Sequence, residues 1–207
     1  MPASRNDPRL ERLLQQPALW RGRHAAQQAT WPTGFDALDG ALPGGGWPCT
    51  GLVEILVPQP GLGEFRLWTP LLARLTSAPA PRWCVFVAAP FEPCAPAFAA
   101  RGIDLARLLF VASVQPLWAL EQSLLSGACD LAFGWLRHAA FQDLRRLVLA
   151  TAEGRAPVVL FRPAECGREP SPATLRLLVE ASPDCLSLRL LKSRGGSRER
   201  IELVLPA

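Results

Sequence analysis

Short apolar runs alternate along the middle of the chain with segments whose apolar residues recur at helical spacing. Runs of this kind are typical of parallel strands buried on both faces, and the helical segments between them indicate βαβ units. The sequence therefore predicts an α/β fold with a mostly parallel central sheet. The expected strands are 52–56, 83–88, 108–114, 131–136 and 158–161, and the expected helices are 64–75, 95–101, 117–126 and 141–152.

The last quarter of the chain holds three further apolar runs, with no helical segment between them. They are 175–179, 186–191 and 201–205. Ser182-Pro183-Asp184 and Gly195-Gly196, which are turn signals, separate these runs. We expect antiparallel C-terminal strands that extend the sheet. Two other stretches rich in Gly, Pro or polar residues, 43–48 and 164–172, are predicted to be loops.

The first residues form a separate unit. Residues 9–16 carry leucines at i, i+3 and i+4 spacing, which predicts a short amphipathic helix that Pro17 ends. Leu19 and Trp20 continue its apolar side, and a polar stretch follows. The predicted organisation is an N-terminal helical arm and linker at 1–29 and an α/β domain at 30–207.

Composition narrows the class of protein. Apolar residues make up 49% of the chain and charged residues 19%, as in a folded globular domain. No apolar run approaches the length of a membrane span, and no export signal opens the chain, so we expect a cytoplasmic location. Six cysteines without a C-x-x-C pair, and two histidines, predict reduced thiols and no metal site. A net charge of +4 permits nucleic-acid contact without requiring it.

One motif carries a resemblance to a known class. Residues 33–42, Gly44-Gly45-Gly46 and 51–55 resemble, in order and spacing, the segment that leads into the nucleotide loop of RecA-type recombinases. A phosphate-binding loop would follow as G-x-x-x-x-G-K-[ST]. The chain instead has Glu64 at the lysine position and Phe65 at the position of the magnesium-binding hydroxyl. The vestigial loop is Pro58, Gln59, Pro60, Gly61, Gly63 and Glu64.

Two further catalytic positions are lost in the same alignment. Pro90 stands where RecA has the glutamate that activates water, and Trp135 stands where it has the magnesium-ordering aspartate. Glu92 is a candidate substitute base, although an exposed loop carboxylate is the simpler interpretation. The resemblance implies a RecA-like P-loop NTPase fold with degenerate Walker motifs. It also implies no catalytic activity and no cofactor.

The combination of motifs most closely resembles the ImuA family of proteobacteria. The matching stretches are 19–22, 42–48, 58–64 and 191–196. This resemblance implies a non-catalytic role in SOS-induced translesion DNA synthesis, an error-prone form of DNA repair. The implied partners are an ImuB-type polymerase homologue and a DnaE-type polymerase, with RecA as a further candidate.

Two other interpretations remain open. The SulA family of cell-division inhibitors, which bind FtsZ, also resembles RecA without a working P-loop, but it favours a shorter chain without the basic C-terminal hairpin. An ATPase that uses unusual residues is the third interpretation, and the residues at positions 64, 65 and 135 argue against it.

The candidate binding residues lie at the two ends of the chain. Basic side chains cluster near the C-terminus, where they could contact a partner protein or, weakly, DNA phosphates; a solvated hairpin tip is the alternative. The candidate contact residues are Lys192, Arg194, Arg198 and Arg200 together with Leu19 and Trp20 of the arm. Trp31 and Trp47 could serve either an interface or the core.

Overall fold

The structure, a computed structural model, describes residues 29–181, 185–193 and 200–204. Leu19, Trp20, Arg194 and Arg198 lie outside this part of the chain. The described strands are β1 (Thr30–Trp31), β2 (Trp47–Pro48), β3 (Leu52–Val57), β4 (Trp83–Val87), β5 (Leu108–Val111), β6 (Cys129–Trp135), β7 (Val158–Pro163), β8 (Leu175–Ala181), β9 (Leu186–Lys192) and β10 (Arg200–Leu203).

The described helices surround the sheet that these strands form. The α-helices are α2 (Asp36–Ala41), α3 (Thr69–Thr76), α4 (Ala95–Ala100), α5 (Pro116–Leu125) and α6 (Phe141–Gly154). The 3-10 helices are η1 (Glu64–Trp68), η2 (Leu105–Arg107) and η3 (Ala164–Arg168). None of the helices in the described ranges is long and apolar enough to cross a membrane.

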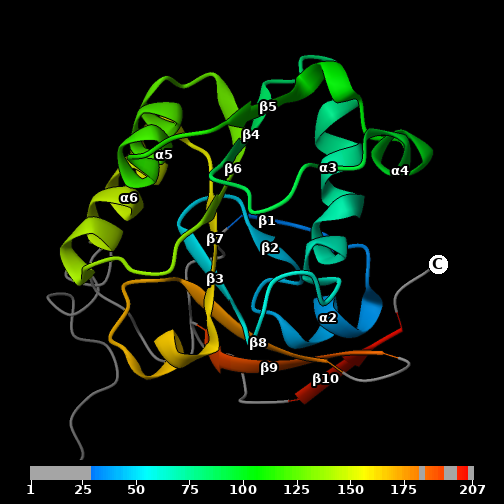
Figure 1. Cartoon of the computed structure of the whole chain (residues 1–207). Coiled ribbons are helices and arrows are strands. Elements are labelled where there is room, and N and C mark those ends of the chain that lie inside the picture. Colours follow the sequence, from blue (N-terminus) through cyan, green and yellow to red (C-terminus); the bar gives the residue numbers. More distant parts are fainter. Residues whose placement is uncertain (1–28, 182–184, 194–199, 205–207) are drawn as a thin grey trace, which may run out of the picture.

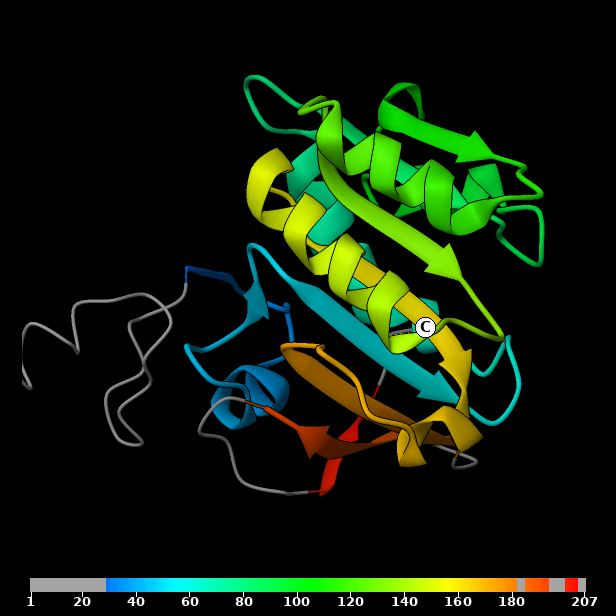
Figure 2. The same cartoon turned by 90° about the vertical axis from the view of Figure 1, so that its left-hand side faces the viewer.

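Eight strands make one sheet in the order β10-β9-β8-β3-β7-β6-β4-β5. Helices α5 and α6 cover one face, and α3 and α4 lie on the other (Figure 1). Figure 2, turned by 90°, places α5 and α6 in front of the strands. Each face therefore has its own buried cluster, with Ile55 on the side of α3 and Leu160 on the side of α6. The predicted α/β class with a mostly parallel sheet and antiparallel C-terminal strands is confirmed.

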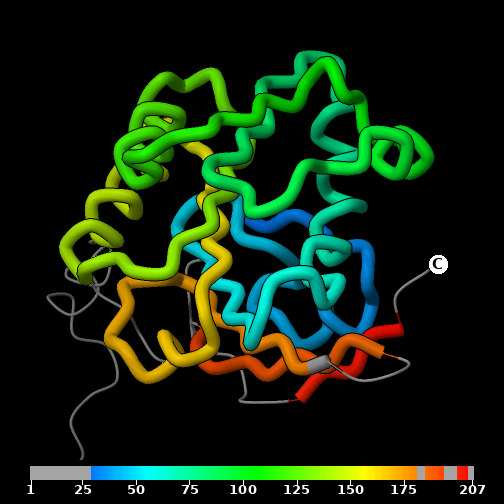
Figure 3. The backbone as a smooth tube through the Cα atoms, in the orientation of Figure 1, coloured from blue at the N-terminus to red at the C-terminus, as the bar shows by residue number. Residues whose placement is uncertain are grey.

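The C-terminal extension differs from the prediction in one strand. β8 runs parallel to β3, with Glu54 beside Arg176, and only β9 and β10 run antiparallel to their neighbours. Figure 3 traces the chain and shows the C-terminal segments, in orange and red, together at one end of the fold. The chain thus adds one more parallel strand at the sheet centre before it reverses direction.

Three predicted boundaries are corrected. The helix expected over 64–75 begins as a 3-10 helix, because Pro70 has no N–H to donate and would clash with the carbonyl group four residues earlier in a continuous α-helix. The strand expected to reach 114 ends at Val111, since its partner strand β4 ends at Val87, directly opposite. The stretch 164–172, expected to be a loop, contains η3.

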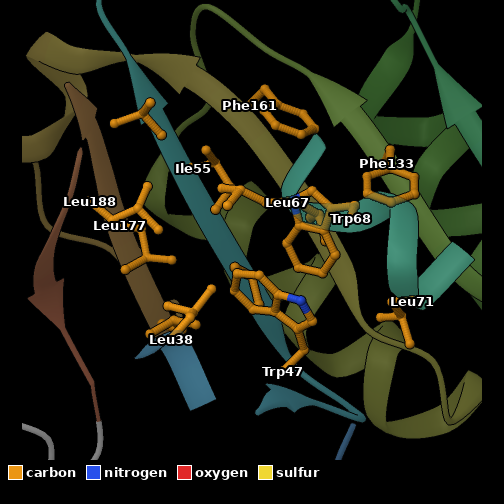
Figure 4. Packing of buried hydrophobic residues seen from close by; sticks show 14 of the residues in the cluster. Leu38, Trp47, Ile55, Leu67, Trp68, Leu71, Phe133, Phe161, Leu177 and Leu188 are labelled. Atoms are coloured by element: carbon orange, nitrogen blue, oxygen red, sulfur yellow. The ribbon is translucent and has the colours of Figure 1, made fainter. Parts of the chain in front are cut away.

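Trp47 belongs to the core rather than to an exposed loop. It lies in β2, which pairs with β1, and its ring stacks on Trp68 with centroids 4.1 Å apart (Figure 4). A Cβ at Gly46 would lie 2.0 Å from the carbonyl oxygen of Trp31, so only glycine allows this approach. Trp31 is half-buried and packs against the same cluster. Both tryptophans therefore have a packing role.

The end of α6 provides a test of local backbone strain. Arg155 has φ 53° and ψ 41°, the left-handed conformation that glycine adopts without steric cost. Arg155→Gly is expected to raise the free energy of unfolding by about 0.5–1 kcal/mol. The same substitution at Arg145, exposed within α6, is the control and is expected to lower it by about 1 kcal/mol. Chemical denaturation measures both, and a destabilised Arg155→Gly would contradict the account.

Candidate functional site

The segment that leads into the loop is held by its own side chains. The Thr33 N–H donates to Asp39 Oδ1 over 2.8 Å, which closes the turn before α2. Gly34 has φ +88°, and a Cβ there would lie 2.6 Å from Pro70 Cβ, so glycine is required against the start of α3. Gly34, in the stretch that carries much of the resemblance to RecA, thus lies directly against the start of α3.

The vestigial loop lies at the carboxyl end of β3, near the middle of the sheet. Pro58, Gln59 and Pro60 are exposed. Gly61 and Gly63 both have left-handed φ values, +95° and +88°, which explains why glycine stands at these positions although the phosphate-binding pattern around them is lost.

Glu64 turns back into this loop. Its side chain is buried, with 4% exposure, and Oε1 accepts a hydrogen bond of 3.0 Å from the Gly61 N–H. No donor among the described residues reaches Oε2, which is also buried. In a phosphate-binding loop the backbone N–H groups face the anion. Here one such donor is already bonded to the chain's own carboxylate, whose negative charge would repel a phosphate.

The hydrogen bond from Gly61 to Glu64 can be measured directly. In Glu64→Ala the Gly61 amide loses its charged acceptor, so we expect its hydrogen exchange to accelerate about tenfold or more. Glu64→Gln keeps an oxygen acceptor and should change the rate much less. Exchange measured by NMR is the test, with Glu92→Ala as the control at a nearby exposed carboxylate. Equal rates in the wild type and Glu64→Ala would refute the bond.

An aromatic cluster fills the space beyond the loop. Phe65, at the position of the magnesium-binding hydroxyl, lies at the centre of five other rings contributed by β4, β6, β7 and α4. Its centroid distances are 5.3 Å to Phe133, 5.7 Å to Phe86, 5.7 Å to Phe98, 6.2 Å to Phe161 and 6.4 Å to Trp135. If the predicted alignment with RecA holds, these apolar rings stand where a nucleotide's metal ion would need oxygen ligands.

Trp135 is part of this cluster. Its ring stacks on Phe161 at 4.8 Å with an interplanar angle of 15°, and the two residues are opposite each other on β6 and β7. Phe86 and Phe133 are likewise opposite on β4 and β6, with stacked rings 5.0 Å apart. Figure 4 shows Phe133 and Phe161 beside Trp68 above the sheet. The structure therefore brings two of the predicted lost positions, 65 and 135, into one packed group.

The third position that is predicted to be lost, Pro90, lies at the surface. Pro90 is exposed in the loop between β4 and α4, and Glu92 is exposed beside it. The neighbouring Phe91 reaches the vestigial loop, because a Cβ at Gly61 would lie 3.8 Å from Phe91 Cε2. The β4–α4 loop thus lies next to Gly61 through an apolar side chain, while Glu92 keeps the exposed position that the simpler interpretation expected.

A buried ion cluster, which the sequence analysis missed, lies across three strands next to the loop. Glu54, in the middle of β3, is fully buried. Its Oε1 accepts from Arg162 of β7 at 2.7 Å, and its Oε2 lies 2.6 Å from Nε of Arg176 on β8. The feature of the sequence that could have indicated this cluster is Glu54 itself, a single charged residue inside an otherwise apolar strand.

The same cluster shapes the segment after β7. Arg176 donates to the carbonyl oxygens of Cys166, at 2.7 Å, and Glu169, at 3.0 Å, and Arg162 contacts Glu169 at 3.1 Å. Burial lowers the pKa of Arg162, but the hydrogen bond and charge of Glu54 outweigh it, so the net pKa is raised. Both guanidinium groups thus hold η3 against the sheet, which is why 164–172 is not an open loop.

The described part of the basic C-terminal group has partners within the chain. Lys192 Nζ donates to the carbonyl oxygen of Ser171 at 2.8 Å. Arg200 donates to Ser187 Oγ at 2.8 Å and lies 3.4 Å from Glu180. Glu180, an acid on β8 that the sequence analysis did not weigh, reduces the positive charge of this surface. Contact of these residues with a partner stays a prediction.

The cysteines behave as separate thiols. All six are free; Cys84, Cys129 and Cys166 are buried, and Cys94 is exposed. Burial raises the pKa of Cys129 to about 12 and also raises the pKa of Cys84, so both thiols stay neutral and unreactive. Within the described ranges, no group of three or more His, Cys, Asp and Glu side chains could hold a metal ion.

Comparison with known proteins gives a limited result. No protein-family model matches the sequence, and no curated protein sequence matches it. Among solved structures, the chain is similar to the crystal structure of SulA from Pseudomonas aeruginosa, with 21% sequence identity and a TM-score of 0.45. The match covers 54% of this chain and 97% of that chain. A likeness of this extent defines neither the family nor the function of this chain.

Proposed function

We propose that this chain is a RecA-like protein without nucleotide hydrolysis that works by binding other proteins. One observation carries the proposal: the region in which a RecA-type site would hold its nucleotide is filled by the chain's own side chains. Glu64 accepts the Gly61 N–H inside the loop, and Phe65 packs among five aromatic rings beyond it.

Hydrolysis needs positive charge and an ordered metal ion at the phosphates. A carboxylate at the lysine position has the wrong sign, since two unit charges 4 Å apart interact by about 4 kcal/mol at an effective dielectric constant of 20. Phe65 and Trp135 offer no oxygen ligand for magnesium. A RecA-like framework whose nucleotide region is filled by side chains is better suited to binding other proteins than to catalysis.

The proposed role is that of an accessory protein in SOS-induced translesion DNA synthesis. The support is the resemblance of 19–22, 42–48, 58–64 and 191–196 to ImuA. The proposed partners are an ImuB-type polymerase homologue and a DnaE-type polymerase, with RecA as a further candidate. Cell-division inhibition through FtsZ is the competing role, from the resemblance to SulA.

A pull-down with the full chain separates these roles. The chain would be offered, in separate reactions, the ImuB-type homologue, RecA and FtsZ from its own organism. Capture of the ImuB-type homologue is the expected result. Capture of FtsZ alone would replace the proposed role with division inhibition, and failure to capture all three would remove both roles.

The basic C-terminal residues provide a variant for the same assay. Replacing Lys192, Arg194, Arg198 and Arg200 together with alanine is expected to weaken capture, because the variant removes the positive charge available to a partner. Folding should persist, since exposed ion pairs such as that of Arg200 with Glu180 contribute about 0–1 kcal/mol. Replacement of four exposed arginines elsewhere is the charge-matched control, namely Arg101, Arg137, Arg145 and Arg155. Equal loss of capture in both variants would show that binding depends on the net charge of the chain and not on the position of these four residues.

A further inference from the structure

A groove lies between helices α5 and α6 where both helices begin. Its volume is about 460 Å³, within the range of pockets that bind ligands. The strands β5 and β6 both run parallel to β4, so α5 and α6, which follow them, run in the same direction side by side (Figure 2). Leu136 and His138, just after the end of β6, belong to the lining of the groove. The groove therefore lies at the carboxyl edge of the sheet.

The topology of the sheet makes this edge a place for a ligand. β4 and β6 are neighbours, yet the chain after β4 leads to α4 on one face and the chain after β6 leads to α6 on the other (Figure 1). Open α/β sheets bind ligands outside the carboxyl ends of the strands at such a point. The vestigial loop after β3 is a different place on this edge, because none of its residues is among the described lining of the groove.

One ion pair links the two walls of the groove. Arg146 of α6 donates to both carboxylate oxygens of Glu121 on α5. Trp118 precedes Glu121 by three residues, about one helical turn. Asp143 precedes Arg146 by the same spacing. Because the two helices run in the same direction, Trp118 and Asp143 face the groove from opposite walls, and both belong to its lining.

Trp118 and Asp143 carry chemistry that contacts within the described chain leave free. The Trp118 side chain is 58% exposed, and Asp143 has no hydrogen-bond or ion-pair partner among the described residues. A carboxylate in the first turn stabilises a helix, but that effect uses none of the acceptor capacity of Asp143. The buried side chains of Leu136 and Leu147 add apolar lining. The groove thus combines an aromatic face, a free carboxylate and an apolar wall.

These groups select a cation as the ligand. With His138 counted as neutral, the carboxylates of the described lining outnumber its single guanidinium group by one. An anion would be repelled by Asp143 and would find Arg146 already bonded to Glu121. Pro116, at the start of α5, has no N–H to donate to it. A cation, in contrast, gains both the carboxylate and the ring face of a tryptophan.

Among cations, a guanidinium group fits best. It is planar, so it stacks on an indole ring while two of its N–H groups donate to one carboxylate. An ammonium group has no planar face for such stacking. The surroundings favour a protein as the source of this group. Val114 in the lining is fully exposed, and a second groove, which shares His138, continues past the start of α6. A protein segment covers such a surface, whereas a small molecule leaves most of it exposed.

We propose that the groove holds an arginine side chain of a partner protein, with the guanidinium group between Trp118 and Asp143. The aliphatic carbons of that arginine lie along Leu136 and Leu147. This inference rests on the proposed function, since it assigns one point of contact to a chain that works by binding other proteins.

A peptide titration tests the groove by itself. The backbone N–H signal of Asp143 and the indole N–H signal of Trp118 should shift saturably in NMR spectra as acetyl-Gly-Arg-Gly-amide is added. The same peptide with citrulline, which has the shape of arginine without its charge, should bind about tenfold more weakly or not at all. Asp143→Asn should raise the dissociation constant of the arginine peptide about tenfold, and Trp118→Ala about fivefold.

Glu153→Gln is the matched control, because it removes an exposed carboxylate elsewhere on α6. It should leave the dissociation constant unchanged. Three results would each overturn the proposal. They are no saturable shift up to tens of millimolar peptide, equal binding of the citrulline peptide, and equal weakening by Glu153→Gln and Asp143→Asn.

Capture of the ImuB-type homologue decides whether a protein supplies the arginine. Asp143→Asn and Trp118→Ala should weaken capture about tenfold, and Glu153→Gln should not. If the peptide binds but both variants capture the homologue as well as the wild type does, the proposal is overturned and the groove belongs to a free guanidinium compound, with agmatine as the probe. If the wild type captures no partner, the proposed function fails, whereas the titration still decides whether the groove takes a guanidinium group.

Discussion

Replacing Glu54 with leucine is expected to lower the free energy of unfolding by about 3–5 kcal/mol. The substitution leaves the guanidinium groups of Arg162 and Arg176 buried without their shared counter-ion. Removal of one member of a buried ion cluster lowers the free energy of unfolding by more than the intact cluster contributes to it, because the remaining charges stay desolvated. Urea denaturation monitored by circular dichroism measures the loss.

A second substitution separates this cause from simple loss of packing. In the double variant with Glu54→Leu and Arg162→Met, one of the orphaned charges is gone, so the loss of stability should be smaller than in Glu54→Leu alone. Glu121→Ala, which breaks the exposed ion pair with Arg146, is the surface control with an expected loss of about 0–1 kcal/mol. A double variant less stable than the single one would contradict the assigned role of Glu54.

Phe133→Ala is expected to have an effect of similar size, about 3–5 kcal/mol. Phe133 is fully buried, and its ring contacts Phe65, Trp68, Phe86 and Phe161. Truncation removes apolar contacts and leaves a cavity that the surrounding rings, fixed on two strands and η1, cannot fill completely. The near-ultraviolet circular dichroism should also change, since the ring packing around Trp68 and Trp135 loosens.

The control for this variant is a phenylalanine outside the cluster. Phe141, at the start of α6, is partly exposed, and Phe141→Ala should change stability by about 1 kcal/mol or less. If Phe133→Ala were as mild as Phe141→Ala, the aromatic cluster would not be the rigid filling of the site that we describe.

The strands and helices could be predicted because their signal is local. Apolar runs and helical spacing predicted nearly every helix and strand between residues 52 and 163. The errors concern element boundaries that are set by a neighbouring strand or residue. β5 ends at Val111 because β4 ends opposite it, and η1 precedes α3 because of Pro70. The end of β5 depends on strand pairing, which the periodicity of the sequence does not reveal. The 3-10 helix before α3 could have been predicted from the proline.

The candidate site was predicted only in part. The resemblance to RecA predicted that Glu64, Phe65 and Trp135 stand at lost catalytic positions, but it did not predict that Phe65 and Trp135 pack together. That contact depends on the register of β6 and β7 and on the position of η1, which are tertiary properties. Glu54 and Arg162 are separated by 108 residues, so their pairing had no local signal at all.

The two glycines of the vestigial loop are explained by the conformation of the backbone. The resemblance to RecA placed Gly61 and Gly63 in the vestigial loop. The φ of +88° at Gly63, together with φ +95° at Gly61, shows that the backbone shape of the loop requires both. A glycine in such a loop is therefore evidence of conformation, and the chemistry must be judged from the neighbouring side chains such as Glu64.

Calorimetric titration of the purified chain with ATP in the presence of magnesium tests whether the vestigial loop can hold a nucleotide. Because Glu64 accepts a hydrogen bond inside the loop and aromatic rings fill the space beyond it, we expect no saturable heat of binding up to millimolar ATP, with or without the metal. Saturable binding that requires magnesium would contradict the account, since it would show that the filled site can open and hold a nucleotide.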